Sequence, residues 1–364
     1  MPIDFPCTLP MRISNMINNA LTLRKNKNGL LLMTLFVILN IFFMCAIDEL
    51  SVAKGTTLNQ GKVFVVYAGS LVKIFEDVIG PAFQNKTGYT YVGEGKGSVQ
   101  AANMIGDGFR SPDVFVSAGA IPILKLMDNN PPLAEWLLEF GSSEMVIAYS
   151  PNSQYYDDLE KAKKGDMPWY DAISKEGFKF GRTDPELDPK GYYAIITAKL
   201  ANIYYNDSSI KERVLGEDRN SKQIFPEEIL KTILESGQLD AVAAYKHEAI
   251  SRGLSYITLP KEINLSDPLF SNFYKKADYT SESDQKTIYG GPIYFSITIP
   301  QTVKNMEGAI SFVNFLLSEN GSQILENQGL NSIVDVLSEG DANKLPPSVR
   351  NLVQSNIKYN DDGK

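Results

Sequence analysis

From residue 62 onwards, apolar and polar positions follow two distinct patterns. Short runs rich in β-branched and aromatic residues, such as residues 63–67, are typical of buried strands. Longer segments, such as residues 191–205, repeat apolar residues at helical spacing. Because the two patterns alternate along the chain, they predict a layered α/β fold. We expect strands at residues 63–67, 90–92, 112–118, 144–149, 178–181, 239–245, 256–260 and 292–300, and helices at residues 71–84, 98–106, 121–127, 169–175, 191–205, 227–235, 309–317 and 321–328.

Two long expected strands, at residues 144–149 and 292–300, bracket the middle of the chain. Such bracketing is what a two-lobe protein requires when the chain leaves one lobe and later returns to it. We therefore expect a discontinuous lobe 1 of residues 62–143 plus 296–345, a lobe 2 of residues 144–295, and a polar tail of residues 346–364.

The N-terminal segment predicts export. Basic residues near the end of residues 1–29 precede a nearly unbroken apolar run within residues 30–46. We interpret residues 1–29 as a cytoplasmic n-region and residues 30–46 as a signal peptide or membrane anchor. Cleavage beyond Ala53, a lipid on Cys45 and a retained helix are all left open. The expected location is the outer face of the cytoplasmic membrane, or a secreted or periplasmic one if the signal is cleaved.

Composition narrows the classes of function. The 364 residues carry a net charge of −8, which would repel nucleic acid, so no nucleic-acid partner is expected. The single histidine, His247, is interpreted as a solvated surface residue. Without a second histidine or a nucleophile motif, a zinc site or a Ser-His-Asp centre is not expected. An acidic protein that binds an anion must use local dipoles and hydrogen-bond donors.

Two Gly-Ser turns supply such donors. Ser70 follows a strand and precedes a helical segment, and Ser98 stands at the start of the next helical segment. A strand, a Gly-Ser turn and a helix direct backbone N–H groups and a hydroxyl towards one point over a helix N-terminus. Either turn alone could be a simple helix cap. The pair predicts a protein that holds a small oxyanion.

Three further residues could bind a ligand, but each could also have only a structural role. Asp188 precedes a helix and could be only its N-cap. Glu227 begins a helix, where a carboxylate suits the helix dipole. Tyr245 ends a strand of small residues and belongs either to the core or to a cleft. The alternative to a binding protein is an exported enzyme that uses Asp188 and Glu227 as an acid/base pair. The sequence shows no nucleophile that would support an enzyme.

These segments together resemble the substrate-binding proteins of molybdate/tungstate ABC transporters, in particular the archaeal type. The resemblance covers about residues 62–330. Its carriers, in order, are Tyr67-Ala68-Gly69-Ser70-Leu71, Gly97-Ser98, Ser117-Ala118, Asp188-Pro189-x-Gly191-Tyr192, Leu234-Glu235-Ser236-Gly237-x-Leu239-Asp240, Tyr245-Lys246 and Ile297-Thr298-Ile299-Pro300.

The resemblance implies a two-lobed type II periplasmic-binding-protein fold with the ligand between the lobes. It assigns ligand binding to Ser70, Ser98, Asp188, Glu227 and Tyr245, with Asp188 and Glu227 adding carboxylate oxygens to the molybdenum or tungsten of the bound anion. It also implies ABC permease subunits as membrane partners, no cofactor and no enzymatic activity; a monomer is expected.

Three departures from the family pattern are visible, one of which is Gln238-Leu239-Asp240 in place of a glycine-flanked Glu-Leu-Asp. The family often has Arg where this chain has Tyr193. The segment before Glu227 is shorter than usual, so Glu227 is assigned by counting back from Gly237 and Tyr245, and Glu228 is the alternative. A protein of the same fold that binds sulfate, ferric ion or a small carboxylate remains the other hypothesis, because fold alone does not choose the ligand.

Overall fold

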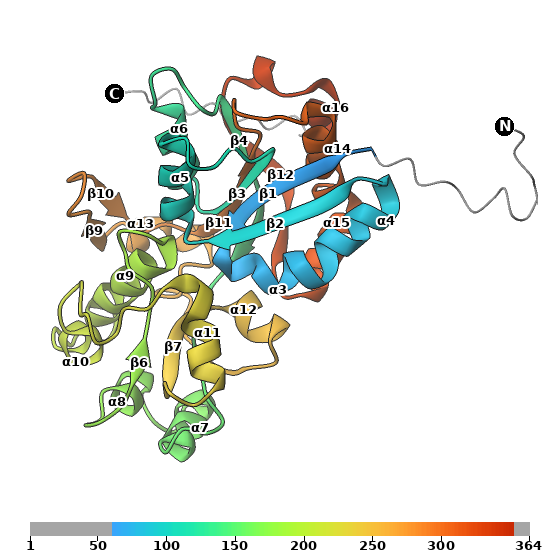
Figure 1. Cartoon of the computed structure of the whole chain (residues 1–364). Coiled ribbons are helices and arrows are strands. Elements are labelled where there is room, and N and C mark those ends of the chain that lie inside the picture. The colour runs from blue at the N-terminus through green and yellow to red at the C-terminus, as the bar shows by residue number, and fades with distance from the viewer. Residues whose placement is uncertain (1–59, 353–364) are drawn as a thin grey trace, which may run out of the picture. The chain divides into compact units, whose positions relative to one another are not determined.

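The computed structural model describes residues 60–352. Two larger β-sheets organise this part of the chain, and a third sheet has only two strands (Figure 1). We use lobe 1 for the part built on the larger sheet and lobe 2 for the part built on the smaller one. The strands of lobe 1 are β1 (Lys62–Ala68), β2 (Thr90–Lys96), β3 (Val114–Ala118), β4 (Trp136–Ser143), β11 (Ile293–Thr298) and β12 (Asn331–Gly340). Those of lobe 2 are β5 (Met145–Tyr149), β6 (Phe180–Gly181), β7 (Ala241–Tyr245) and β8 (Ser255–Thr258).

The large sheet has the order β12-β4-β11-β3-β1-β2. β1 pairs in parallel with both β2 and β3, so the carboxyl ends of these three strands lie at one edge. β11 returns from late in the sequence and pairs antiparallel with β3 and β4. In open parallel sheets, ligands bind outside the carboxyl ends of the strands. The edge formed by β1, β2 and β3 is therefore where a site is expected.

The small sheet has the order β6-β7-β5-β8. β4 ends at Ser143 and β5 begins at Met145, so the chain passes from one sheet to the other through Glu144 alone. It returns after β8 through two short strands, β9 (Asp278–Thr280) and β10 (Thr287–Tyr289), and then enters β11. The large sheet is thus built from two separate parts of the sequence, and the strands of the small sheet lie between them. The residue boundaries of the two lobes stay predictions.

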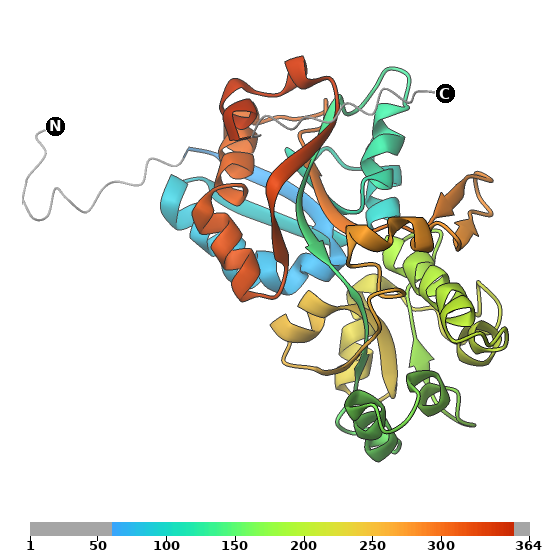
Figure 2. The same ribbon diagram turned by 180° about the vertical axis from the view of Figure 1, so that it is seen from behind.

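Helices cover both faces of the large sheet (Figures 1 and 2). α5 (Ser98–Gly106) and α6 (Ile121–Met127) pack their apolar residues against Val66 and Phe115 on one face. On the other face Phe312 of α14 (Met306–Leu316) packs with Val65. The remaining helices near this sheet are α3 (Val72–Ile74), α4 (Gly80–Thr87), α15 (Glu319–Asn327) and α16 (Pro347–Leu352).

Lobe 2 is built around α9 (Pro189–Tyr204), a helix whose first half is almost entirely buried. α11 (Glu227–Glu235) packs its Leu230 and Leu234 with Val242 of β7. The other helices of lobe 2 are α7 (Tyr156–Lys164), α8 (Trp169–Ile173), α10 (Ile210–Leu215), α12 (Lys246–Ser251) and α13 (Ser271–Tyr274).

The α/β prediction is confirmed, and most expected elements occur within a few residues of their predicted limits. The expected helices at residues 98–106 and 227–235 coincide with α5 and α11. β4, β9, β10, β12, α7, α10, α12 and α13 were not predicted. No helix among residues 60–352 is long and apolar enough to cross a membrane. The predicted signal or anchor at residues 30–46, together with Cys45, lies outside the described residues.

Candidate functional site

The two serine turns lie where β1 and β2 end. Ser70 occupies a 3-10 turn, Gly69–Leu71, directly after β1. Its side chain is buried, and its hydroxyl has no hydrogen-bond partner. Ser98 is the first residue of α5 and is fully buried, and its Oγ accepts a hydrogen bond of 3.0 Å from the backbone N–H of Ala118. Because that hydroxyl acts as an acceptor in this bond, its own proton is available to a ligand.

Asp188 is the N-cap of α9, and Pro189 is the first residue of the helix. Its Oδ1 accepts from the backbone N–H of Lys190 at 3.1 Å and from the hydroxyl of Thr183 at 3.0 Å. The N-cap interpretation is therefore correct. Burial, and next the negative charge of Glu227, raise the pKa of Asp188 to about 7. An N-cap in water would not show this effect, so Asp188 lies in a second, acidic environment as well.

Glu227 is the first residue of α11 and follows Pro226. It is only 5% exposed, and its carboxylate accepts from Lys190 Nζ at 2.7 Å and from Lys231 Nζ at 2.5 Å. Its neighbour Glu228 has a side chain that is 30% exposed and pairs with Lys96 of lobe 1 at 2.9 Å. Of these two glutamates, only Glu227 combines burial with proximity to Asp188.

Tyr245 ends β7 and caps α12. Its side chain is buried, its hydroxyl has no hydrogen-bond partner, and Lys190 Nζ lies 5.5 Å from the centre of its ring. Burial raises the pKa of Tyr245 well above its usual value, and the charge of Asp188 acts in the same direction. Tyr245 therefore lies in the electrostatic environment of Asp188.

The turns of lobe 1 lie directly against Glu227 and against the Leu187–Asp188 segment of lobe 2. A Cβ atom on Gly69 would fall 2.4 Å from Cγ of Glu227, and one on Gly97 would fall 2.6 Å from the carbonyl oxygen of Leu187. A backbone hydrogen bond of 3.0 Å from Gln100 to that carbonyl also joins the lobes. Gly97, Asp188 and Glu227 line one cavity of about 240 Å³. The structure brings both predicted carboxylates beside the serine turns; Ser70, Ser98 and Tyr245 are not among the residues that line this cavity.

Glu227 belongs to a buried ring of four charged side chains that was not predicted. Lys190 and Lys231 each contact both Glu227 and Glu248. Glu248 also accepts a hydrogen bond of 2.9 Å from the backbone N–H of Tyr245. The spacing of Glu227 and Lys231, four residues apart on one helix, was the available signal in the sequence. A second signal was Glu248, because a glutamate three residues after an N-cap is typical of a capping box. It was not recognised because the N-cap is Tyr245, whereas N-caps are usually Ser, Thr, Asp or Asn.

The surface interpretation of His247 is wrong. His247 is fully buried, its Nδ1 lies 3.0 Å from the hydroxyl oxygen of Ser143, and its ring centre is 5.1 Å from that of Phe295. Burial lowers the pKa of His247 to about 4, so the ring is neutral at pH 7. The prediction failed because α12 packs against the strands of lobe 1, a contact between segments far apart in sequence.

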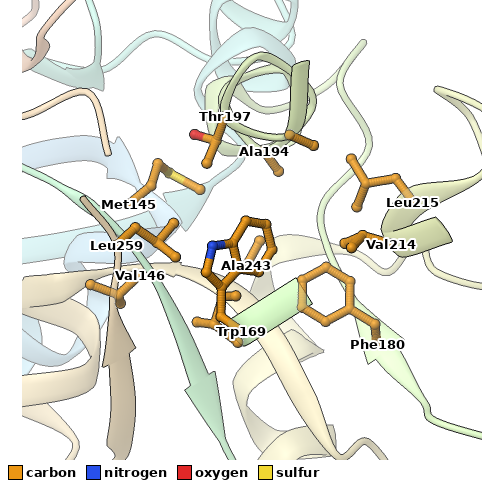
Figure 3. Close-up of a pocket in the computed structure, with 12 residues that line it drawn as sticks. Met145, Val146, Trp169, Phe180, Ala194, Thr197, Val214, Leu215, Ala243 and Leu259 are labelled. Carbon is orange, nitrogen blue, oxygen red and sulfur yellow. The ribbon is translucent and has the colours of Figure 1, made fainter. Parts of the chain in front are cut away.

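A second cavity, in the core of lobe 2, is small and apolar (Figure 3). It measures about 30 Å³ and lies between α9 and the small sheet. Its polar side-chain atoms are the hydroxyl of Thr197 and the indole nitrogen of Trp169, neither of which has a hydrogen-bond partner. No charged side chain lines it. It is too small to hold an oxyanion, and its two donors are uncharged.

Comparison with known proteins shows the family of the chain. The family model described as bacterial extracellular solute-binding protein matches residues 63–331. An uncharacterized solute-binding protein of Petrotoga mobilis is 33% identical over 279 residues, which are 75% of this chain and 84% of the relative. The molybdate/tungstate-binding protein WtpA of Pyrococcus abyssi is 32% identical over 323 residues, or 82% of this chain and 92% of the relative.

Solved structures agree on the fold. The sulfate-binding protein SubI of Mycobacterium tuberculosis has a TM-score of 0.51 at 12% identity, covering 75% of this chain and 87% of that one. The periplasmic molybdate-binding protein of Azotobacter vinelandii has a TM-score of 0.50 at 16% identity, covering 74% and 98%. The periplasmic-binding-protein fold implied by the sequence resemblance is thus confirmed. The chain belongs to the family of bacterial extracellular solute-binding proteins and is a homologue of proteins named molybdate/tungstate-binding protein WtpA.

Proposed function

We propose that this protein captures molybdate or tungstate outside the cytoplasmic membrane and delivers it to the permease of an ABC importer. One observation carries the proposal: two buried carboxylates of lobe 2, Asp188 and Glu227, lie beside the Gly-Ser turns of lobe 1 and line one cavity together with Gly97. The relatives named as molybdate/tungstate-binding proteins support the choice of ligand.

Carboxylates in an anion site are explained by the chemistry of the metal. Molybdenum(VI) and tungsten(VI) accept further hard oxygen donors beyond their four oxo groups, whereas sulfur in sulfate does not readily expand its shell. Asp188 and Glu227 would therefore bind the metal of molybdate or tungstate and repel sulfate and phosphate. The same residues serve affinity for one ligand and exclusion of its competitors.

The donors of lobe 1 suit the oxo groups. The hydroxyl of Ser70 is buried without a partner, and that of Ser98 has a proton to donate. α5 begins at Ser98, so its first backbone N–H groups add a positive local potential. The unpartnered hydroxyl of Tyr245 is a further donor on the side of lobe 2. We assign to these three hydroxyl groups the binding of oxo groups.

The test is calorimetry of the purified protein with tungstate, molybdate, sulfate and phosphate, preceded by elemental analysis for copurified metal. We expect tight binding of tungstate or molybdate and weak binding of the other two anions. Replacement of Asp188 by Ala should weaken tungstate binding by several kcal/mol, on the scale of breaking a buried charged contact, and spare or improve sulfate binding. Tight sulfate or phosphate binding without a response to tungstate would refute the proposal, and so would copurified iron alone.

Delivery and assembly complete the proposal. Solute-binding proteins of ABC importers hand their ligand to permease subunits in the membrane, and we propose that this chain does so as a monomer. Since the family is one of solute-binding proteins, we assign no catalytic role to Asp188 and Glu227. An anchor at residues 30–46 would keep the receptor at a high effective concentration beside its permease. Full transport by a soluble form released into the medium, with a mature N-terminus beyond Ala53, would contradict the anchor.

A further inference from the structure

Two lysines and two glutamates form a closed, buried ring in lobe 2. Lys190 Nζ lies 2.7 Å from Glu227 and 3.0 Å from Glu248, and Lys231 Nζ lies 2.5 Å and 2.6 Å from the same two carboxylates. The exposed fractions of the four side chains lie between 0% and 4%. Each lysine therefore bridges both glutamates, and the ring carries two positive and two negative charges.

Such a ring is stable only while it is complete. Buried ions lose their hydration, and mutual attraction offsets that loss only when every charge is paired and hydrogen-bonded. Burial lowers the pKa of Lys190, but the charges of Glu227 and Glu248 outweigh it and the net effect raises that pKa. Burial likewise raises the pKa of Glu248, and the two lysines more than reverse this. The pairing therefore favours the charged forms of Lys190 and Glu248.

The ring connects every proposed ligand residue of lobe 2. Lys190 donates its backbone N–H to Asp188 and its side chain to Glu227. Glu248 accepts from the backbone N–H of Tyr245. The starts of α9, α11 and α12 are thus joined through one set of ion pairs. Lys190 contacts one carboxylate oxygen of Glu227 and Lys231 contacts the other, so together they fix the plane of this carboxylate, and the Cγ of Glu227 packs against Gly69.

We infer that Lys190 and Lys231 are positioning residues that set the preference for metal oxyanions over sulfate, by holding the carboxylate of Glu227 in the orientation in which it can donate oxygen to the metal. This inference rests on the proposed function and names the residues that make it selective. Each oxygen of a carboxylate can accept more than one interaction, so the contacts with lysine leave Glu227 able to bind a metal.

The main experiment uses Lys190→Met and Lys231→Met in the otherwise complete chain. Calorimetry gives the affinities for tungstate, molybdate and sulfate, and the molybdenum K-edge pre-edge intensity reports whether bound molybdate is four- or six-coordinate. We expect tungstate and molybdate affinity to fall roughly 10- to 100-fold, as when the residues that support a metal ligand are changed. Sulfate affinity should stay nearly constant, and the pre-edge should rise towards that of free tetrahedral molybdate.

Two further variants keep the result decisive. Lys211→Met removes a lysine of lobe 2 that pairs with Asp218 away from the ring, and it should change no affinity. If Lys190→Met does not fold, the double variant Lys190→Met/Glu248→Gln removes one charge of each sign and leaves Glu227 with Lys231 alone. Thermal melting confirms that each variant is folded, and the double variant is expected to lose metal preference in the same way.

The outcomes separate the inference from the function. A folded Lys190 variant that keeps wild-type tungstate affinity and pre-edge intensity would overturn the inference and leave the proposed function intact. An equal loss of affinity for all anions would also overturn it, because the lysines would then only neutralise the site. A wild-type protein that does not bind tungstate or molybdate would instead refute the proposed function.

Discussion

Gly69 and Glu227 meet across the two lobes so closely that the glycine has no room for a side chain: a Cβ atom there would lie 2.4 Å from Cγ of Glu227. Neither residue is near the other in sequence. Their contact brings the Ser70 turn and the Glu227 carboxylate into one site, and it provides a direct way to test whether the lobes must close in this manner.

Replacing Gly69 by Ala should weaken binding of tungstate by roughly tenfold or more, because the added methyl group must displace Glu227 or separate the lobes. Calorimetry measures the effect. The matched control is Gly106→Ala at the end of α5, where a Cβ would meet only Asn129 at an ordinary 3.6 Å. If both variants bind tungstate like the wild type, this contact has no part in binding.

Glu227→Gln and Glu228→Gln form a pair of neighbouring substitutions with opposite expectations. Glu227→Gln should lose most tungstate affinity, since an amide is a poor metal ligand and leaves two buried lysines underpaired. Glu228→Gln removes only a partly exposed ion pair with Lys96, an interaction that typically contributes ~0–1 kcal/mol. Titration with tungstate decides; a larger loss for Glu228→Gln would transfer the ligand role to that residue.

Asp188 should make both stability and binding depend on pH. Burial and Glu227 raise the pKa of Asp188 to about 7, above its unfolded value of ~3.9, so the folded protein binds this proton more tightly. Its stabilising contribution is present below about pH 4 and is lost as pH rises towards 7. Urea unfolding without ligand at several pH values should show the wild type losing stability relative to Asp188→Asn across this window.

Tungstate affinity should change with pH in the opposite direction. The carboxylate must be ionised to donate oxygen to the metal, so affinity should increase up to about pH 7 and then level off. Asp188→Asn should remove this increase. Stability and affinity curves for the variant that run parallel to those of the wild type would show that Asp188 does not titrate in this range.

Ser70→Ala should weaken tungstate, molybdate and sulfate alike, by ~1–3 kcal/mol for a lost buried donor. Since the hydroxyl has no partner within the protein, the variant should melt at the wild-type temperature or above it. Thr197→Val is the control, because it removes an equally unpartnered hydroxyl that faces the apolar cavity of lobe 2. Unequal effects of Ser70→Ala on the three anions would argue against a general oxo-group donor.

The local pattern predicted much of the fold because local rules determine it. α5 begins at Ser98 after a glycine, and α11 ends before Ser236 and Gly237, so their limits follow from capping and from the glycine stop. β4 was missed because its apolar pattern is interrupted. Trp136–Ser143 begins with three apolar residues, but Glu139, Gly141 and the following polar residues break the run. Pairing with β11 and β12 makes it a strand, and that pairing is not local.

In the candidate site, too, features set by neighbouring residues were predicted, and features set by residues distant in sequence were not. Asp188 at the start of a helix was recognisable from the sequence, and so were the two Gly-Ser turns. The burial of Lys190 and Glu248, and of His247 beside Ser143, was not, because a charged or polar side chain is predicted to be exposed unless its distant partner is known. The roles of the five proposed ligand residues in binding stay predictions.

Both proposed metal donors stand next to a proline: Pro189 follows Asp188, and Pro226 precedes Glu227. A proline ring fixes one backbone torsion and favours the first position of a helix. The main chain that carries each carboxylate therefore loses its conformational freedom when the protein folds, well before an anion arrives. A ligand entering this site would not have to order those two segments, so more of its interaction energy would remain as affinity.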